Sequence, residues 1–339
     1  MRVQEIDTDD DQALESLRAV FNAAAQHDMP TEPEVSLDEV REIAKGFRSS
    51  DSVVVLAGDD DVAGGGIVIM PKKDNRESAE FIVFVHPDHR RKGAGSAIVR
   101  YLERIAAERG RRSFSGQSGE MLGAASSARP FAEKLGYVAV LEESQWTLDL
   151  PVATALLDEL EQASAGFAEG YEIVRWMDHC PEELIDGMAD LQAGMSTDAP
   201  HGDLTHEAQI WDADRVRQLE DMALGMSNTS YLAGAVDKSS GRLVAFTVAV
   251  VNRSTAESGR QFATIVNRDH RGHRLGILIK VANLRQIIER SPLTTKIQTW
   301  NADTNTHMMS VNAALGFYAS GKSTVWQKEL PTPDSSAAV

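Results

Sequence analysis

Two stretches of the chain, HPDHRRKGAGSAIV at residues 86–99 and NRDHRGHRLGILIK at residues 267–280, share one pattern. Each contains Asp-His-Arg, then a glycine five residues after the arginine, and the two arginines are 181 residues apart. A second landmark, Leu-Gly-aromatic, occurs at residues 135–137 and again at 315–317, an offset of 180. Two unrelated landmarks that keep almost the same register predict two copies of one domain.

The residues around each basic segment predict a strand, a loop and a helix. Paired apolar runs that flank a polar turn predict hairpins, at residues 53–57 with 63–70 and at residues 231–236 with 243–251. A short apolar strand then leads into each loop, at residues 81–85 and 263–266. After the loop, apolar residues recur at helical spacing until Gly110 in the first copy and Pro292 in the second. A further strand is predicted at residues 296–300.

This order of elements predicts a mixed α/β fold with partly antiparallel sheets in two fused domains. We expect an N-terminal domain at residues 1–150, a linker helix at 151–169 and a C-terminal domain at 170–330. The final residues, PTPDSSAAV at 331–339, have the composition of a disordered tail.

The composition narrows the class of protein. Apolar residues make up 42% of the chain, which is enough for a packed core, and 34 Lys and Arg against 51 Asp and Glu give a formal charge of −17. Such a charge argues against general binding to nucleic acids or to anionic membranes, because both need a basic surface. One cysteine, no apolar run of 18 residues and no signal-like N-terminus lead us to expect a cytoplasmic protein.

The two basic segments differ in charge from the acidic remainder of the chain. Their net charge is +5 over residues 86–112 and +4 over residues 267–290. A strand followed by a glycine-containing loop and a helix N-terminus favours anion binding, because the first N–H groups of a helix have no partner within it. The sequence therefore predicts a small anionic ligand rather than an extended polyanion.

The segment Arg90-Arg91-Lys92-Gly93-Ala94-Gly95 resembles the R/Q-x-x-G-x-G/A loop of the GCN5-related N-acetyltransferase (GNAT) family. The resemblance implies acetyl-CoA as co-substrate, with its pyrophosphate held by this loop, and the repeat implies a tandem arrangement over residues 1–330. The second-half strings are similar to actinobacterial two-domain acetyltransferases and, more distantly, to mycothiol synthase.

The resemblance assigns coenzyme contacts to both copies. They are Phe84, Val85, Arg90, Arg91, Lys92, Gly93, Ala94, Gly95 and Ser96 in the first copy, and Ile265, Val266, Arg271, Gly272, His273, Arg274, Leu275, Gly276, Asn301 and Asn305 in the second. Arg274 departs from the family pattern, because it replaces the first glycine of the loop, where it adds bulk or binds a phosphate directly. For Asn305 the alternative to a pantetheine contact is a helix cap.

The catalytic residues are less clear than the loops. The family often uses a tyrosine to protonate the departing thiolate, and the corresponding positions here are Ala132 and Asn312, neither of which can donate that proton. Glu80, beside the strand at 81–85, is the candidate general base by analogy with the family. The alternative is a solvated acid at the start of a strand.

On the acceptor side, Asp198 and Asp203 are the candidate residues to bind an ammonium group, although a solvated loop with capping aspartates is the simpler interpretation. The histidines show no metal-ligand spacing, so we expect no metal site. Cys180 has no basic cluster near it in sequence, which argues against a nucleophile.

These observations predict acetyl transfer from acetyl-CoA to the amine of a small molecule, by direct attack in a ternary complex. The rival hypothesis keeps the fold and makes one or both domains an acyl-CoA-binding module without catalysis. The oligomeric state, the acceptor and the active copy are left open.

Overall fold

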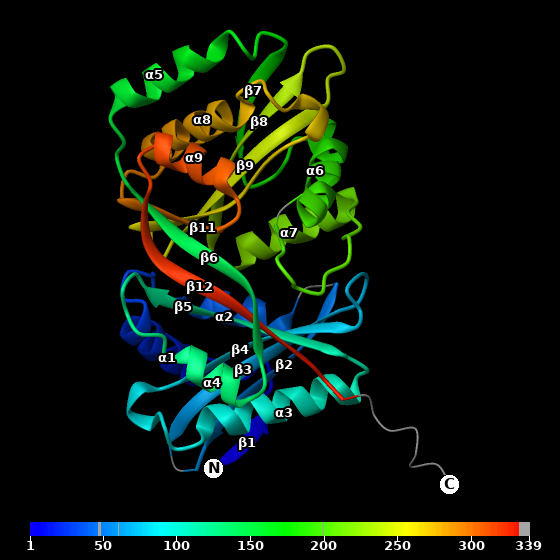
Figure 1. Ribbon diagram of the computed structural model, residues 1–339, viewed down its shortest axis with the longest axis vertical. Helices are drawn as coiled ribbons and strands as arrows, with labels where there is room; N and C mark the ends of the chain where they lie inside the picture. Colours follow the sequence, from blue (N-terminus) through cyan, green and yellow to red (C-terminus); the bar gives the residue numbers. More distant parts are fainter. Residues whose placement is uncertain (47–48, 60, 199, 332–339) are drawn as a thin grey trace. The chain divides into compact units, whose positions relative to one another are not determined.

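The computed structural model describes residues 1–46, 49–59, 61–198 and 200–331, and it forms two units (Figure 1). Unit 1 comprises Met1–Glu142, His201–Glu207 and Lys322–Val339, and unit 2 comprises Glu143–Pro200 and Ala208–Gly321. The tail predicted at 331–339 lies outside the described residues, except for Pro331. The mixed α/β fold predicted from the sequence is confirmed in both units.

In unit 1 the strands lie in the order β1-β2-β3-β4-β5-β12-β6. Neighbouring strands from β1 to β4 are antiparallel, and β4 and β5 are parallel. The strands are β1 (Arg2–Glu5), β2 (Ser50–Gly58), β3 (Val62–Pro71), β4 (Ser78–Val85) and β5 (Ser113–Met121), with parts of β6 (Val138–Asp149) and β12 (Tyr318–Glu329). The helices are α1 (Asp11–Asp28), α2 (Leu37–Lys45), α3 (Ala94–Glu108) and α4 (Ala128–Lys134), with a short 3-10 helix at Pro87–His89.

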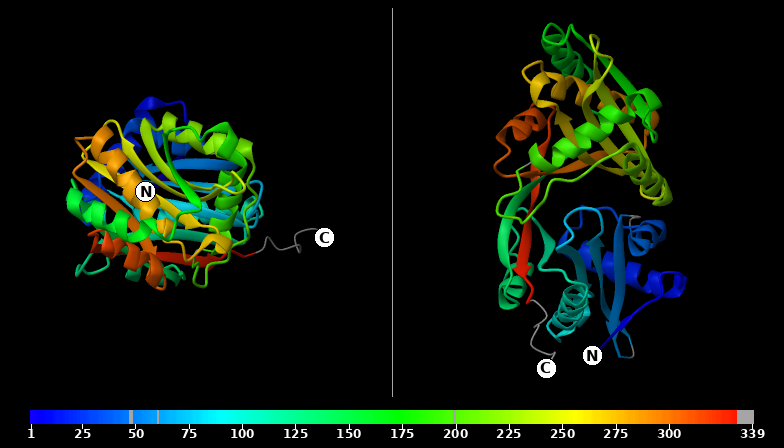
Figure 2. Two further views of the ribbon diagram at one scale, coloured as in Figure 1. Left: turned by 90° about the horizontal axis from the view of Figure 1, so that it is seen from above. Right: turned by 90° about the vertical axis from the view of Figure 1, so that its right-hand side faces the viewer.

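Helices cover both faces of the unit 1 sheet, with α3 on one face and α1 and α2 on the other (Figure 2). Strand β2 presents apolar side chains to both faces. Val53 and Val55 pack into the cluster with α3, while Val54 and Leu56 pack into the cluster with α1 and α2. This alternation is the period of two expected for a strand that is buried on both faces.

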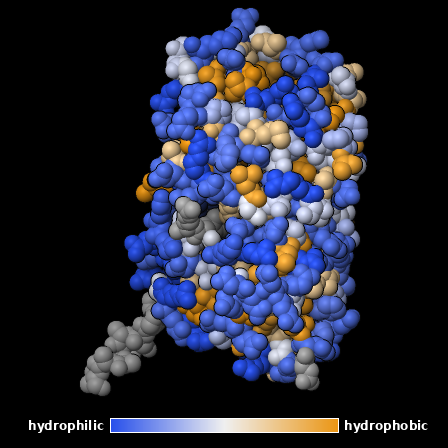
Figure 3. Space-filling model, turned by 180° about the vertical axis from the view of Figure 1, so that it is seen from behind, coloured by the Kyte–Doolittle hydropathy of each residue, from blue (hydrophilic) through white to orange (hydrophobic). Residues whose placement is uncertain are grey.

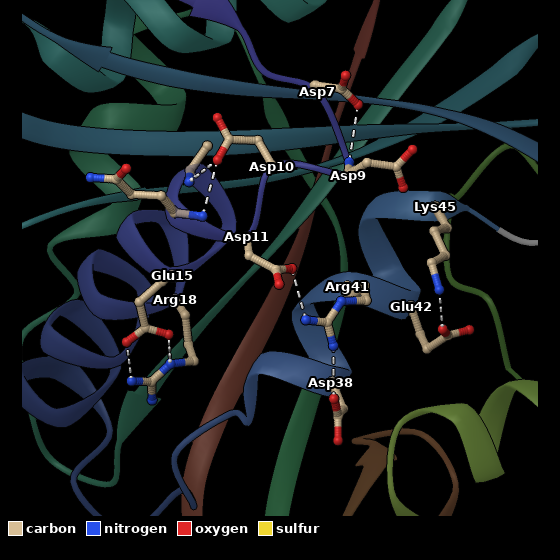
Figure 4. A network of polar contacts seen from close by, with 12 residues as sticks. Asp7, Asp9, Asp10, Asp11, Glu15, Arg18, Asp38, Arg41, Glu42 and Lys45 are labelled. Carbon is tan, nitrogen blue, oxygen red and sulfur yellow. Dashed lines mark hydrogen bonds and ion pairs between the residues drawn. The ribbon is translucent and has the colours of Figure 1, made fainter.

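Local polar contacts stabilise the N-terminal ends of α1 and α2 (Figure 4). Asp10 caps α1 by accepting hydrogen bonds from the N–H groups of Gln12 and Ala13, and Ser36 and Glu39 form a capping box on α2. Arg41 of α2 pairs with Asp11 of α1 at 2.9 Å. These contacts provide hydrogen-bond partners for backbone N–H groups at the helix starts, and they connect the two helices.

In unit 2 the strands lie in the corresponding order β7-β8-β9-β10-β11-β6-β12. The strands are β7 (Tyr171–Met177), β8 (Asn228–Asp237), β9 (Leu243–Asn252), β10 (Ser258–Val266) and β11 (Lys296–Ala302). The helices are α5 (Thr154–Ala165), α6 (Ile185–Asp198), α7 (Ala213–Gly225), α8 (Leu275–Arg290) and α9 (Thr306–Ala314), with 3-10 helices at Glu182–Leu184 and Arg268–His270. Helices α6 and α7 pack on one face of the sheet and α8 on the other.

The units exchange strand segments, because β6 and β12 each contribute to both (Figure 1, green and red). In unit 2, residues 143–149 of β6 pair with β11, and Leu148 is part of the core. In unit 1, Trp326 of β12 is buried in the core and donates a hydrogen bond from Nε1 to Ser118 Oγ at 2.8 Å. The boundaries of the two sequence repeats therefore differ from the boundaries of the two packing units.

Helix α5, within the segment predicted as a linker helix, packs in unit 2. Leu157 is buried in the core beside α8, and Arg285 of α8 pairs with Asp158 at 2.5 Å and Glu161 at 3.1 Å.

The surface seen from behind consists mostly of hydrophilic side chains, with hydrophobic ones in small groups (Figure 3). None of the helices within the described residues has the length and apolar character needed to cross a membrane.

Candidate functional site

The two basic loops share one backbone conformation but place glycine differently. In unit 1 the residues with positive φ are Arg91 (63°) and Gly93 (94°), and in unit 2 they are Gly272 (87°) and Arg274 (54°). The left-handed conformation thus occurs at the first and third positions after the loop arginine in both units. Only glycine adopts it without steric cost, so each loop carries one strained arginine, at opposite positions.

In the described part of the chain, the lack of hydrogen-bond partners for the backbone N–H groups of these loops indicates that the loops bind an anion. Among the residues that the structure describes, no backbone N–H from Arg91 to Ser96, or from Gly272 to Ile277, donates a hydrogen bond. Helices α3 and α8 begin within these stretches, so their dipoles add partial positive charge at the same place. Consecutive N–H groups at a helix start suit a phosphate or diphosphate.

The loop arginines themselves brace the loops. Arg90 donates from Nε to the carbonyl oxygen of Val85 at 3.2 Å, and its two terminal nitrogens bind the carboxylate of Asp28, the last residue of α1, both at 2.8 Å. Unit 2 repeats the arrangement, because Arg271 binds the carbonyl oxygen of Val266 at 3.2 Å and Asp198, the last residue of α6, at 2.5 Å. In each unit, the guanidinium group of this arginine therefore connects the end of the strand, the loop and the end of the helix.

Asp198 has a second cationic partner, because Arg268 donates from Nε to its other oxygen at 2.7 Å. These hydrogen bonds, first that from Arg268, lower the pKa of Asp198, whose side chain is 11% exposed. The predicted acceptor pair also falls in separate units, since Asp203 belongs to unit 1, where its N–H donates to Val140 O at 2.9 Å. The carboxylate of Asp198 is occupied by two arginines, and its acceptor role stays a prediction that this geometry does not favour.

Two side chains of the unit 2 loop contact helix α5 and the segment that follows it. Arg274 donates to the carbonyl oxygen of Ala163 at 2.9 Å and stacks on the Phe167 ring at 4.3 Å, and His273 Nδ1 lies 3.0 Å from the carbonyl oxygen of Phe167. The Arg274 guanidinium thus binds protein, and its direct contact with a phosphate stays a prediction that this geometry does not favour. In unit 1, Lys92 donates to Asp88 O at 3.0 Å.

Several predicted contact residues can reach a ligand only through the backbone. Phe84 and Ile265 are buried in the cores at the ends of β4 and β10, and Ala94 and Leu275 are buried at the first positions of α3 and α8. Gly95 leaves little room for a side chain, since an added Cβ would lie 3.2 Å from the Phe131 ring.

Each unit has a pair of parallel strands that separate. In unit 1 the pairing of β4 with β5 ends at Phe81 and Gly116, and in unit 2 the pairing of β10 with β11 ends at Gln261 and Thr299. Unit 2 adds a β-bulge, because the register of β10 on β9 shifts between Gln261 and Ala263 and leaves Phe262 as an extra residue. The β3–β4 ladder has no such shift. A bulge takes backbone groups out of the ladder and redirects them.

A cavity of about 210 Å³ lies in unit 2 where β10 and β11 diverge. It extends from Met195 of α6 on one face of the sheet to Lys280 of α8 on the other. Its remaining lining residues are Glu143, Pro200, Gln261, Phe262, Ala263, Thr264, Thr299, Trp300, Asn301, Ala302, Asn305 and Met308. The predicted residues Asn301 and Asn305 are thus brought together at one cavity.

Each of the two asparagines that line this cavity is hydrogen-bonded to a residue of α9. Asn305 caps α9 by accepting from the N–H of Met308 at 3.2 Å, and it also lines the cavity. Asn312 donates from Nδ2 to Asn301 Oδ1 at 2.7 Å and is fully buried, and its own Oδ1 has no partner within the described chain. Both interpretations of Asn305, a helix cap and a residue at the pantetheine site, are compatible with its position.

Comparisons with known proteins agree with this geometry. Residues 49–139 match the sequence model of the acetyltransferase (GNAT) domain. The chain is similar in structure to a tandem GNAT protein from the clavulanic acid biosynthesis pathway, solved without AcCoA, with a TM-score of 0.79, 22% identity and coverage of 98% of this chain and 99% of that one. The chain is a tandem GNAT-fold protein. The predicted family resemblance is confirmed, and the remoter likeness to mycothiol synthase stays a prediction.

Two further structures share the fold over nearly the whole length of this chain. A GCN5-related N-acetyltransferase from Sphaerobacter thermophilus has a TM-score of 0.65 and 17% identity, covering 98% of this chain and 97% of its own. A glucosamine N-acetyltransferase region of a fungal multi-domain GH3 β-N-acetylglucosaminidase has a TM-score of 0.64 and 13% identity, covering 96% of this chain and 38% of its own. No curated protein matches the chain in sequence.

Within the GNAT fold, Glu80 lies on β4 opposite Ser115 of β5, one pair before the two strands separate. Its side chain is reachable by solvent, yet the surrounding protein raises its pKa because it disfavours the charged form. The corresponding residue of unit 2, Gln261, is buried. Its amide nitrogen donates hydrogen bonds to the hydroxyl of Thr247 and to the carbonyl oxygens of Val248 and Ala263. Gln261 therefore braces the bulge.

The structure adds a carboxylate that sequence reasoning missed. Glu143 lines the unit 2 cavity from β6, where it is paired with Ala302 of β11. Burial, together with the charge of Asp303, raises the pKa of Glu143 above its ordinary value. No local signal could have placed it here, because the repeat assigns residue 143 to the first copy of the domain.

Two other expectations concern residues away from the cavity. Cys180 is buried in the unit 2 core, and burial raises its pKa to about 12, so its thiolate form is strongly disfavoured. Within the residues described, His, Cys, Asp and Glu side chains form no group of three suited to hold a metal ion.

Proposed function

We propose that the protein transfers an acetyl group from acetyl-CoA to the amine of a small molecule, with the chemistry in unit 2. The observation that carries this proposal is the cavity at the divergence of β10 and β11, next to a helix whose first N–H groups donate no hydrogen bonds. The N–H groups of Gly272–Gly276 would hold the pyrophosphate, and the acyl end of the coenzyme would enter the cavity.

The residues around the cavity support direct attack by the acceptor amine. Glu143 lines the cavity, and its raised pKa makes it a stronger base toward the attacking amine than an ordinary carboxylate. Backbone groups released by the bulge at Phe262 would stabilise the negative charge that develops on the thioester oxygen. Cys180 lies elsewhere in the core, which leaves no thiol at the cavity to form a covalent intermediate.

The acceptor is proposed from two observations. The glucosamine N-acetyltransferase region similar to this chain acts, by its name, on a small amine. The formal charge of −17 would attract a cationic acceptor from solution. A cavity of about 210 Å³ holds only the reacting ends of the two substrates, so the remainder of the acceptor would stay outside it.

For unit 1, binding of acyl-CoA without catalysis is a second candidate function. Its loop has the family glycines and matches the domain model, yet Ala132 stands at the position of the family's acid and β4 has no bulge. Glu80 remains the candidate base if unit 1 is active.

A pair of variants tests this assignment. In Glu143→Gln we expect thiol release from acetyl-CoA, measured with a panel of small amines, to fall by about a hundredfold, because proton transfer contributes that much to such reactions. Binding of acetyl-CoA, measured by calorimetry, should remain. Glu80→Gln is the matched control and should keep its activity.

The opposite result, loss in Glu80→Gln alone, would move the chemistry to unit 1. Binding of acetyl-CoA with no thiol release across the panel would favour the acyl-CoA-binding module.

A further inference from the structure

Lys280 is a buried lysine on the inner face of α8. Its side chain is 2% exposed, and its neighbours on the helix, Ile279 and Val281, belong to the unit 2 core. The repeat places Val99 at the corresponding position of α3, where it is completely buried in the unit 1 core. Lysine is rarely buried without a partner, because an ammonium group is costly to desolvate.

The amine of Lys280 has no polar partner in the part of the chain that the structure describes. Its Nζ lies 5.4 Å from the centre of the Phe317 ring, and the residue lines the cavity between β10 and β11. Burial alone lowers the pKa of Lys280 to about 7, so at neutral pH the amine is present in both protonation states.

The charged and titratable groups around α8 do not neutralise this amine. Glu143 lines the same cavity from β6, and Asp303 follows β11. Tyr231 of β8 packs in the same core as α8, and Asp158 and Glu161 of α5 pair with Arg285. None of them is a source of the shift at Lys280, which has burial as its sole cause.

We propose that Lys280 contacts the sulfur of coenzyme A in the unit 2 cavity and is the acid that protonates the departing thiolate. The proposal rests on the proposed function and adds the group that Asn312 cannot supply. Helix α8 would then serve the coenzyme twice, through the N–H groups at its start and through a side chain in its second turn.

The proposed step balances as follows. The acceptor nitrogen forms a bond to the thioester carbon, and the C–S bond breaks as its electron pair leaves on sulfur. A proton moves from the Lys280 ammonium to that sulfur, while the proton lost by the acceptor nitrogen passes to Glu143. Proton exchange with solvent then restores both side chains, and the products are the amide and the free thiol of coenzyme A.

The test compares coenzyme A with desulfo-coenzyme A, which lacks the sulfur, in calorimetric titrations of the full chain. We expect the wild-type protein to bind coenzyme A about tenfold more tightly at unit 2, because a hydrogen bond to a charged group is lost with the sulfur. Lys280→Met should bind both ligands equally. Unit 1 has its own loop, so a second site that does not distinguish the ligands is expected.

A spectroscopic measurement supports the titrations. Near pH 7, where part of the Lys280 amine still carries its proton, the ultraviolet band of the thiolate should be stronger in the wild-type complex than in the Lys280→Met complex, because a nearby ammonium favours the thiolate. Lys238→Met, which removes an exposed lysine of unit 2 that binds only the carbonyl oxygen of Glu169, is the control and should behave as wild type. Thermal melting checks that each variant is folded.

Equal binding of the two ligands by the wild-type protein would overturn the role of Lys280 while leaving coenzyme binding intact. Acetylation of Lys280 during turnover, detected by mass spectrometry, would also overturn it, since the amine would then be a nucleophile. Failure of the wild-type protein to bind either ligand would instead refute the proposed function.

Discussion

At the scale of single residues, the two loops show that one backbone conformation tolerates different sequences. Arg91 and Arg274 each adopt a conformation that costs a non-glycine residue about 1–2 kcal/mol, and each stands where the other loop has glycine. The costs are not equivalent, because Arg274 binds Ala163 and Phe167, whereas Arg91 makes no such contact. Arg91 is therefore the position at which strain has no compensation.

We expect Arg91→Gly to raise the free energy of unfolding of unit 1 by about 0.5–1 kcal/mol, the relief of strain less the entropy that glycine adds to the unfolded chain. Chemical denaturation measures the change. Lys92→Gly, at the next position, has no positive φ to relieve and should destabilise the unit. A loss of stability in Arg91→Gly as large as in Lys92→Gly would contradict this interpretation.

At the scale of elements, one helix in each unit, α1 in unit 1 and α6 in unit 2, is connected to the glycine loop by an ion pair. Asp28 ends α1 and Asp198 ends α6, and each carboxylate binds the loop arginine that also binds the end of the preceding strand. Burial alone would raise the pKa of Asp28, but the hydrogen bonds and charges of Arg90 and then His27 outweigh it, so that the pKa is lowered. The position of the loop thus depends on an ionised carboxylate.

We expect Asp28→Asn to lower the free energy of unfolding at pH 7 by about 1 kcal/mol, because the partly exposed bidentate pair is lost. Since the pKa of Asp28 is lower in the folded protein, the contribution is present above its unfolded value, near 3.8, and disappears as pH falls through the folded value. The difference from wild type should therefore vanish in acid. Asp11→Asn, which breaks an exposed pair with Arg41 (Figure 4), is the control and should cost less than about 0.5 kcal/mol.

Elements with strong local patterns could be predicted from the sequence, and the others could not. The hairpins, the strands before the loops and the helices after them were predicted because apolar spacing marks them. Strand β5 (Ser113–Met121) was not predicted, because only its first three residues are buried and the others are glycines, polar residues and one methionine without a clear alternation. Asn301 and Asn305 were predicted at the site, whereas Glu143 and Lys280 were missed because their roles depend on contacts distant in sequence.

At the scale of the whole molecule, each unit depends on a segment encoded in the other half. Unit 1 needs residues 322–330 of the C-terminal copy, which bring Trp326 and Leu330 into its core. Unit 2 needs residues 143–149, which pair with β11 and bring in Leu148. The two halves of the sequence therefore do not correspond to two independent folding units.

A chain that ends at Gly321 tests this dependence. We expect unit 1 to lose its stable fold, because burial of Trp326 alone contributes about 3–5 kcal/mol. Hydrogen exchange should show loss of protection in β2–β4 and α3. A chain that ends at Pro331 keeps every described residue and should behave as wild type, and retained protection in the shorter chain would disprove the dependence.

The exchanged strands also constrain how such a protein evolves. After a duplication, two copies with separate sheets could lose either member and leave a working survivor. Here deletion of one copy would also take a strand from the other, so reversion to a single-domain ancestor would require a simultaneous repair of the remaining sheet edge. The catalytic inactivity of one copy, should it arise, would be no reason for that copy to disappear.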